Sequence, residues 1–316
     1  MAQSDNPIKK PRYTGIPTFM RVPFAEDWSA VDIAMIGVPY DGGVTNRPGA
    51  RHGPREVRNS SSMMRLINQA TGCCPYDLAR IADIGDCVIE RPFQLEGAHG
   101  EIDRFYEQVI AAGLVPLSVG GDHSISLPIL RQIGKDRPVG MIHIDAHADT
   151  GDDYFGSRFH HGAPFRRAAE EGVLDPKRTI QIGIRGGIND RDQWSFSHES
   201  GMRVIYMHEI PGMGLDAVIA EALKVAGDGP TYLSFDIDAC DPAYAPGTGT
   251  PEFGGFTAAE ALHLLRGLSA VDFIGGDMVE VSPPFDPSGN TALLGATILF
   301  EQLCLLAEAF ARRKAA

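Results

Sequence analysis

The sequence predicts an α/β fold built around a parallel β-sheet. Short apolar segments rich in β-branched residues alternate along the chain with longer segments of helical pattern. Several of the short segments contain few polar residues, which is typical of strands buried on both faces of a parallel sheet. Alternation at this spacing indicates βαβ units with right-handed crossovers.

The predicted elements follow one another without an internal repeat or a long low-complexity segment. Residues 1 to about 30 are rich in proline and polar residues and are predicted to form an N-terminal arm. Since no linker follows the arm, residues 1–316 are interpreted as one domain. The predicted strands are Asp32–Val38, Leu114–Val119, Met141–Ile144, Thr179–Ile184, Arg203–Met207, Thr231–Ile237 and Phe273–Val279. The predicted helices are Arg55–Ile67, Leu95–Ala112, Pro164–Glu171, Leu215–Val225, Ala258–Leu268 and Ala292–Arg312.

Composition and charge argue against several classes of function. The formal net charge of −13 argues against a general nucleic-acid binder. No run of apolar residues approaches the length of about 18 that is typical of a membrane span, and the N-terminus lacks the apolar segment of a signal peptide. The five cysteines lack metal-type spacing and are expected to be free thiols. A cytoplasmic protein without membrane contacts is therefore expected.

Polar side chains gather directly after four of the predicted strands. The segments GGDHS (120–124) and DAHAD (145–149) each follow a strand, Asp236 and Asp238 end a third, and Glu280 follows a fourth. Ligands of α/β sheets bind outside the carboxyl ends of the strands. Four segments far apart in the sequence are thus expected to converge at one edge of the sheet.

The residue types in these segments predict a centre for two metal ions. Alternate residues of an extended chain share one face, so Asp145, His147 and Asp149 are expected to point the same way. So much buried carboxylate requires compensating cations, and mixed carboxylate–imidazole sites suit Mn²⁺, with Ni²⁺ as the main alternative. Asp145 and Asp236 are expected to bridge the two ions. The predicted ligands are His123, Asp145, His147, Asp149, Asp236 and Asp238.

Three of these segments resemble the signature blocks of the ureohydrolase (arginase–agmatinase) family, in the family's order. They read GGDHS, HIDAHADT and SFDIDACDPAYAPGTGTPE, and DMVEVSPPFD resembles the family's C-terminal acidic block. The resemblance extends from about Ile33 to the end of the chain. It implies a three-layer α/β/α fold with a mainly parallel eight-stranded sheet, a binuclear Mn²⁺ site and a homotrimer or homohexamer.

The resemblance also implies roles for individual residues in hydrolysis of a small guanidino compound to urea and an amine or amino acid. Asp149 matches the ligand that also orients the attacking water. Glu280 matches the glutamate that pairs with the guanidinium group. In the segment FHHGAPF, His161 matches the proton-shuttling histidine, and His160 is the competing candidate.

The substrate is less well determined by the sequence. Gly151 stands where arginases carry asparagine, and the segment from Asp149 to Gly156 looks more like guanidinobutyrases and guanidinopropionases, in which an aromatic residue matching Tyr154 shortens the pocket. Gly151 also departs from these two subfamilies, which tend to carry asparagine there. An ω-guanidino acid is therefore the expected substrate, with Gly151, Tyr154 and His160 in the pocket. Alternatives are agmatine, a nickel-dependent reaction on free guanidine or a biguanide, and a catalytically silent partner subunit. Asp152 and Asp153 would favour a cationic tail, whereas Arg158 or Arg47 would favour a carboxylate.

Overall fold

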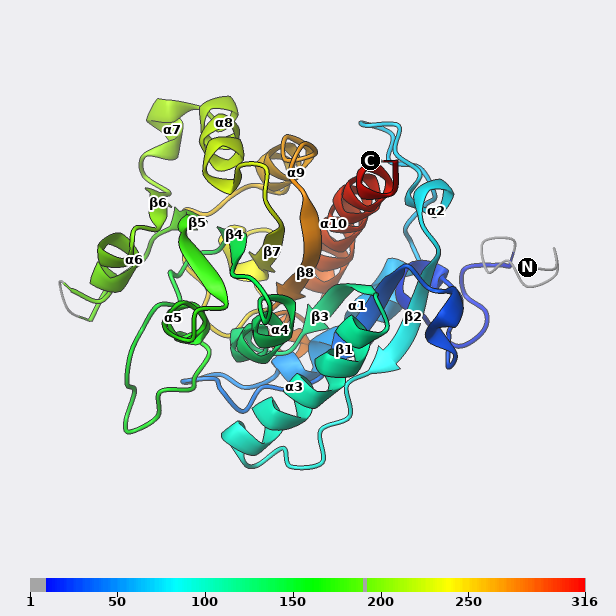
Figure 1. Cartoon of the computed structure of the whole chain (residues 1–316), viewed down its shortest axis with the longest axis horizontal. Helices are drawn as coiled ribbons and strands as arrows, with labels where there is room; N and C mark the ends of the chain where they lie inside the picture. Colours follow the sequence, from blue (N-terminus) through cyan, green and yellow to red (C-terminus); the bar gives the residue numbers. More distant parts are fainter. Residues whose placement is uncertain (1–9, 190–191, 316) are drawn as a thin grey trace.

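A single twisted sheet forms the centre of the molecule (Figure 1). The computed structural model describes residues 10–189 and 192–315, so the first nine residues of the predicted arm lie outside the described part. Every pair of neighbouring strands in the sheet is parallel, in the order β2-β1-β3-β8-β7-β4-β5-β6. The strands are β1 (Ile33–Val38), β2 (Ile81–Asp86), β3 (Val115–Gly120), β4 (Val139–Ile144), β5 (Leu174–Ile184), β6 (Arg203–Tyr206), β7 (Thr231–Asp236) and β8 (Phe273–Val279).

Helices cover both faces of this sheet and complete a three-layer α/β/α fold, as the sequence predicted. One hydrophobic core lies between the sheet and helices α3, α4 and α5, and a second lies between the sheet and helices α1, α8, α9 and α10. The helices are α1 (Gly53–Ser61), α2 (Pro75–Leu78), α3 (Leu95–Ala111), α4 (Ser126–Ile133), α5 (Pro164–Glu170), α6 (Ser195–Ser200), α7 (Ile210–Met213), α8 (Leu215–Ala226), α9 (Ala258–Arg266) and α10 (Asn290–Ala315).

The seven predicted strands and six predicted helices are present, but the prediction missed strand β2, helix α4 and the short helices α2, α6 and α7. Strand β2 is an edge strand with the sequence IADIGD, and its last two residues are not buried, so it lacks the apolar run of the inner strands. Helix α4 carries a proline in its first turn, which obscured its pattern. Helix α1 ends at Ser61 rather than continuing to Ile67.

The C-terminal helix α10 is an exception to the expected absence of a membrane-length segment. By length and composition alone it is apolar enough to cross a membrane, with a mean hydropathy of 1.6 in its most apolar window. However, 72% of that window is buried inside the fold. A helix that is apolar all round is also typical of the core of a large soluble domain.

Four neighbouring strands at the centre of the sheet, β3, β8, β7 and β4, all end at the same edge. The chain segment after each of these strands carries one of the polar motifs that the sequence singled out. The order of the strands therefore brings together segments that are up to 157 residues apart, as in the hydrogen bond between His123 and Glu280.

Candidate active site

His123 lies at the centre of one half of a buried carboxylate cluster. It follows β3, and its Nδ1 atom lies 3.1 Å from Asp145 Oδ2, 3.0 Å from Asp149 Oδ2 and 3.3 Å from Asp236 Oδ2. Among the described residues this nitrogen has no hydrogen-bond partner of good geometry, although it is fully buried. A nitrogen lone pair facing three carboxylate oxygens is the arrangement that a divalent cation requires.

His147 forms the centre of the other half of the cluster. Its Nδ1 atom lies 3.5 Å from Asp145 Oδ1 and 3.2 Å from Asp238 Oδ2. Asp145 thus offers one oxygen to each histidine, as a bridging carboxylate would. The structure brings all six predicted ligands together, while a contact between Asp236 and the His147 half remains a prediction.

The buried carboxylates of this cluster favour the binding of positive charge. Burial raises the pKa of Asp236, and the neighbouring Asp238 and Asp145 carboxylates raise it further. Burial lowers the pKa of His123, but the surrounding carboxylates outweigh burial and raise it well above its usual value. Both raised pKa values mean that Asp236 and His123 bind protons more strongly when no other cation is present. The donor set therefore fits two divalent ions, which would replace those protons.

Two of the predicted catalytic residues have strained backbone conformations. Asp149 has a φ of 51° and Glu280 a φ of 64°, in the left-handed region that non-glycine residues seldom adopt. Such strain costs on the order of 1–3 kcal/mol per residue and is concentrated at functional sites. Glu280 directly follows β8, and Asp149 lies five residues after the end of β4, so both strained residues belong to segments at the same sheet edge.

Glu280 and His161 form a buried pair beside the cluster. Glu280 Oε1 accepts a hydrogen bond from the His123 backbone N–H at 2.9 Å and lies 2.9 Å from His161 Nδ1. The other oxygen, Oε2, is buried and has no hydrogen-bond partner among the described residues. A buried carboxylate oxygen without a donor is costly. Glu280 therefore has an open position for a donor such as a guanidinium N–H.

The other nitrogen of His161 contacts a residue that the sequence analysis did not single out. Thr45 lies with its hydroxyl oxygen 2.9 Å and its backbone nitrogen 3.2 Å from His161 Nε2. Burial lowers the pKa of His161, but the Glu280 carboxylate raises it more strongly, to about 9. The Thr45 N–H can donate to the neutral ring, and the Thr45 hydroxyl can accept from the protonated ring. His161 can thus hold or release a proton at Nε2 without losing its partner.

His160, the alternative proton shuttle, connects two parts of the 152–162 loop through its ring nitrogens. Its Nδ1 accepts a hydrogen bond from the Gly162 N–H at 3.2 Å, and its Nε2 lies 3.2 Å from the Asp152 carbonyl oxygen. Gly151 packs against the same loop, and a Cβ atom added there would lie 2.8 Å from the Gly162 carbonyl oxygen. A side chain at position 151 would therefore require this loop to shift.

The cluster opens into a pocket of about 640 Å³. The predicted residues Gly151, Tyr154, His160 and His161 line it, and Tyr154 is 41% exposed. Glu280 is not among the lining residues, but its carboxylate contacts His161, which does line the pocket. The lining residues that sequence reasoning missed include Thr45, Arg166, Trp194 and Thr250.

Both acidic residues named from the sequence, Asp152 and Asp153, line the pocket, whereas Arg158 and Arg47 are not among its lining residues. Asp152 is neutralised by three arginines, Arg158, Arg166 and Arg167, at 3.6, 3.0 and 2.8 Å. Together with Glu170, these five residues carry three positive and two negative charges, a net charge of +1. Of the three arginines, Arg166 lines the pocket, whereas Arg158 does not.

Arg47, the other arginine proposed from the sequence, also lies away from the pocket lining. Its guanidinium group packs over the ring of Phe285 at 3.8 Å. Asp153 does line the pocket, and its carboxylate accepts a hydrogen bond from the Gly156 N–H at 2.9 Å.

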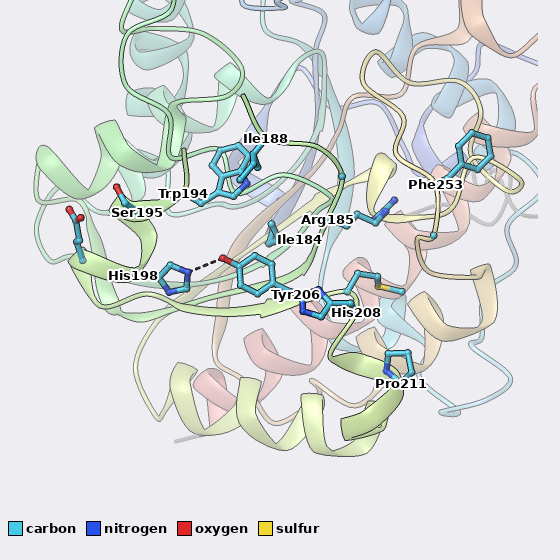
Figure 2. A pocket seen from close by; sticks show the side chains of 14 residues that line it. Ile184, Arg185, Ile188, Trp194, Ser195, His198, Tyr206, His208, Pro211 and Phe253 are labelled. Atoms are coloured by element: carbon cyan, nitrogen blue, oxygen red, sulfur yellow. Dashed lines mark hydrogen bonds between the residues drawn. The ribbon is translucent and has the colours of Figure 1, made fainter. Parts of the chain in front are cut away.

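A second, more apolar pocket of about 930 Å³ lies beside the edge strand β6 (Figure 2). Its labelled side chains include Tyr206, stacked on His208, and Trp194, which also lines the first pocket. Ile188 and Phe253 at its rim are 51% and 81% exposed. This pocket contains none of the predicted ligands.

Comparison with known proteins gives consistent matches over nearly the whole chain. The family described as "Arginase family" matches residues 31–304. A guanidinopropionase from Pseudomonas aeruginosa is 57% identical over 303 residues, which cover 96% of this chain and 95% of that protein. A guanidinobutyrase from the same organism is 48% identical and covers 94% of both chains.

Solved structures agree with these matches. Proclavaminate amidino hydrolase from Streptomyces clavuligerus superposes with a TM-score of 0.91 at 38% identity, covering 95% of this chain and all of the other. A formiminoglutamase from Trypanosoma cruzi, described as a structure with Mn²⁺, gives a TM-score of 0.80 at 26% identity, covering 93% and 98%.

Proposed function

Because this chain belongs to the arginase family and is a hydrolase of guanidino compounds, we propose that its substrate is an ω-guanidino acid of the guanidinopropionate type. The products are urea and the corresponding amino acid. The observation that carries the proposal is the buried, unpartnered Oε2 of Glu280 beside the His/Asp cluster. A planar guanidinium group supplies N–H donors and a positive charge to such an oxygen.

Six residues would hold two divalent ions, with Mn²⁺ as the proposed metal and Ni²⁺ as the alternative. His123 would ligate one ion and His147 the other, and Asp145 would contribute an oxygen to each. When bound, the ions lower the pKa of water and supply a nucleophile at neutral pH. The remaining ligands are Asp149, Asp236 and Asp238.

The chain's own residues orient the reactants and move the protons. Glu280 fixes the guanidinium group by charge-assisted hydrogen bonds and so places its carbon atom near the cluster. Asp149, which lines the pocket, accepts a hydrogen bond from the attacking water and orients it. His161 then donates its Nε2 proton to the leaving amine and is reprotonated from the pocket.

The proton-transfer role of His161 predicts a difference between neighbouring histidines. His161→Ala should lower kcat by about 10²–10⁴-fold with metal content unchanged, because a positioned general acid is lost. The wild-type rate should fall above about pH 9, where His161 loses its proton, and the variant should lack this alkaline limb. Rate–pH profiles and metal analysis check both points. If His160→Ala shows this behaviour instead, His160 is the shuttle.

A carboxylate tail is supported by the cationic cluster that reaches the pocket at Arg166. Its guanidinium group is held 3.0 Å from both Asp152 and Glu170 and lies over the Phe196 ring at 4.8 Å. Arg166 would pair with the carboxylate of a guanidino acid and not with the ammonium group of agmatine, whereas Asp153 in the same lining would favour the ammonium group.

Replacing Arg166 tests this assignment. Arg166→Met should raise KM for 3-guanidinopropionate by about 10-fold or more, because an ion pair to a partly buried group is lost. KM for agmatine should stay the same or fall. The matched control is Arg158→Met, which removes the same charge from the cluster outside the pocket. Equal effects on both substrates would contradict a carboxylate subsite at Arg166.

The other hypotheses make different predictions for the purified enzyme. An agmatinase would prefer agmatine, and a nickel enzyme acting on guanidine or a biguanide would release urea only after reconstitution with Ni²⁺. A silent subunit would release no urea. All six ligand-type residues are present and clustered, which supports an active enzyme.

We further propose a cytoplasmic homo-oligomer, a trimer or hexamer, that uses the apolar pocket at β6 as a contact between copies (Figure 2). Exposed apolar patches of this kind mark protein interfaces. Phe253→Asp should therefore yield a smaller assembly in light scattering, while Phe93→Asp, at a similarly exposed phenylalanine, should not. An unchanged mass for Phe253→Asp would place the interface elsewhere.

A further inference from the structure

A buried histidine that is not among the predicted ligands lies behind the metal cluster. His143 is on β4, fully buried, with its ring centroid 4.4 Å from that of Phe165. Its Nε2 atom lies 2.7 Å from Asp145 Oδ2. Its Nδ1 atom lies 3.1 Å from the side-chain nitrogen of Gln181 on β5.

The hydrogen bonds of Gln181 fix the tautomer of His143. The Gln181 side-chain nitrogen also donates to the Ala148 carbonyl oxygen, which can only accept. The NH₂ group of the amide is therefore the end that faces both partners, and it donates to His143 Nδ1. The ring proton of neutral His143 must then be on Nε2, where it is donated to Asp145 Oδ2.

This bond constrains one oxygen of the proposed bridging carboxylate. Asp145 Oδ1 accepts the His147 backbone N–H at 2.6 Å, while Oδ2 accepts the N–H of His143 and faces His123 Nδ1 at 3.1 Å. A carboxylate oxygen has two lone-pair sites. With one site of Oδ2 occupied by His143, the other is directed toward the His123 half of the cluster.

We propose that His143, held in one tautomer by Gln181, is a positioning residue that orients Asp145 Oδ2 toward the ion beside His123. The inference rests on the two-ion site of the proposed function. The two halves differ in this respect, because only the oxygen facing His123 receives an imidazole donor. Loss of His143 should thus lower the affinity for the ion beside His123 more than the affinity for the ion beside His147.

Titration of metal-free full-length enzyme with Mn²⁺ by calorimetry tests the proposal. His143→Phe should weaken binding of one ion by about 10- to 100-fold, the usual effect of losing an outer hydrogen-bond partner, and change the other only a few-fold. Gln181→Met should weaken the binding of the same ion, but by a smaller factor than His143→Phe does. His143→Gln keeps a side-chain N–H donor and should restore most of the affinity. Electron paramagnetic resonance of the bound Mn²⁺ gives a second readout.

Tyr106→Phe is the matched control, because it removes an equally buried hydrogen bond, to Ser118, without touching the cluster. It should leave both affinities unchanged. Unchanged affinities in folded His143→Phe would overturn the proposal; if that variant does not fold, unchanged affinities in Gln181→Met would do so. Failure of the two-ion site itself would be seen separately, as fewer than two Mn²⁺ bound by wild type.

Discussion

Asp149→Asn should reduce urea release by at least about 10³-fold, the loss expected when an oriented electrostatic partner of the reaction is removed. Asparagine keeps the size of the side chain and tolerates the left-handed φ of 51°, so the backbone is not expected to change. The substitution removes the charge that faces His123 Nδ1 at 3.0 Å. It also replaces one carboxylate oxygen by an NH₂ group, so one of the two acceptors proposed to ligate the metal and orient the water is lost. Steady-state urea assays and metal analysis on the same sample measure both losses.

The control for this variant is Asp32→Asn. Asp32 is also nearly buried and paired with an arginine, Arg80, but it lies before β1, at the opposite edge of the sheet. Its substitution should affect stability and leave kcat/KM near the wild-type value. Normal turnover by Asp149→Asn would refute the assignment of this residue to both the metal site and the nucleophile.

Glu280→Gln should lower kcat/KM by roughly 30- to 4,000-fold, which corresponds to the loss of about 2–5 kcal/mol when one partner of a buried charge pair is neutralised. Oε1 accepts the His123 N–H, so an amide oxygen will take that position and turn its NH₂ group toward the guanidinium. Two sets of donors would then face each other. The loss should be present with every guanidino substrate, because it concerns the shared group.

Glu301→Gln serves as the matched control for this substitution. Glu301 is buried and paired with Arg266 and Asn68, but it lies on α10, away from the cluster. Its substitution should lower the unfolding temperature without changing kcat/KM of the folded enzyme. A loss of activity in Glu280→Gln that its melting curve shows to come only from unfolding would contradict the guanidinium role.

The convergence of the cluster residues could be predicted from the sequence because their type and position act together. Asp145, His147 and Asp149 follow an apolar strand at alternate positions, and Asp236 and Asp238 repeat this spacing. A parallel sheet brings all such strand ends to one edge. The inner strands could be predicted for a related reason, since complete burial leaves an apolar run in the sequence.

Other features carried no such signal. Strand β2 is at the sheet edge and half of its pattern is polar, so its sequence resembles a loop. Thr45 and Arg166 reach the pocket from a loop and from helix α5, and neither residue type at those positions is unusual by itself. His143 is the first residue of the HIDAHADT segment, but only the structure shows that the bond from Gln181 to its Nδ1 places the ring proton on Nε2, facing Asp145.

The most direct measurement is urea release by wild-type enzyme reconstituted with Mn²⁺ from equal concentrations of 3-guanidinopropionate, 4-guanidinobutyrate, agmatine, arginine, guanidine and a biguanide. We expect one of the two guanidino acids to have a kcat/KM at least about 100-fold above that of agmatine, because Arg166 in the pocket would pair with a carboxylate tail and not with an ammonium tail. Preference for agmatine or free guanidine, or no urea from any compound, would contradict it.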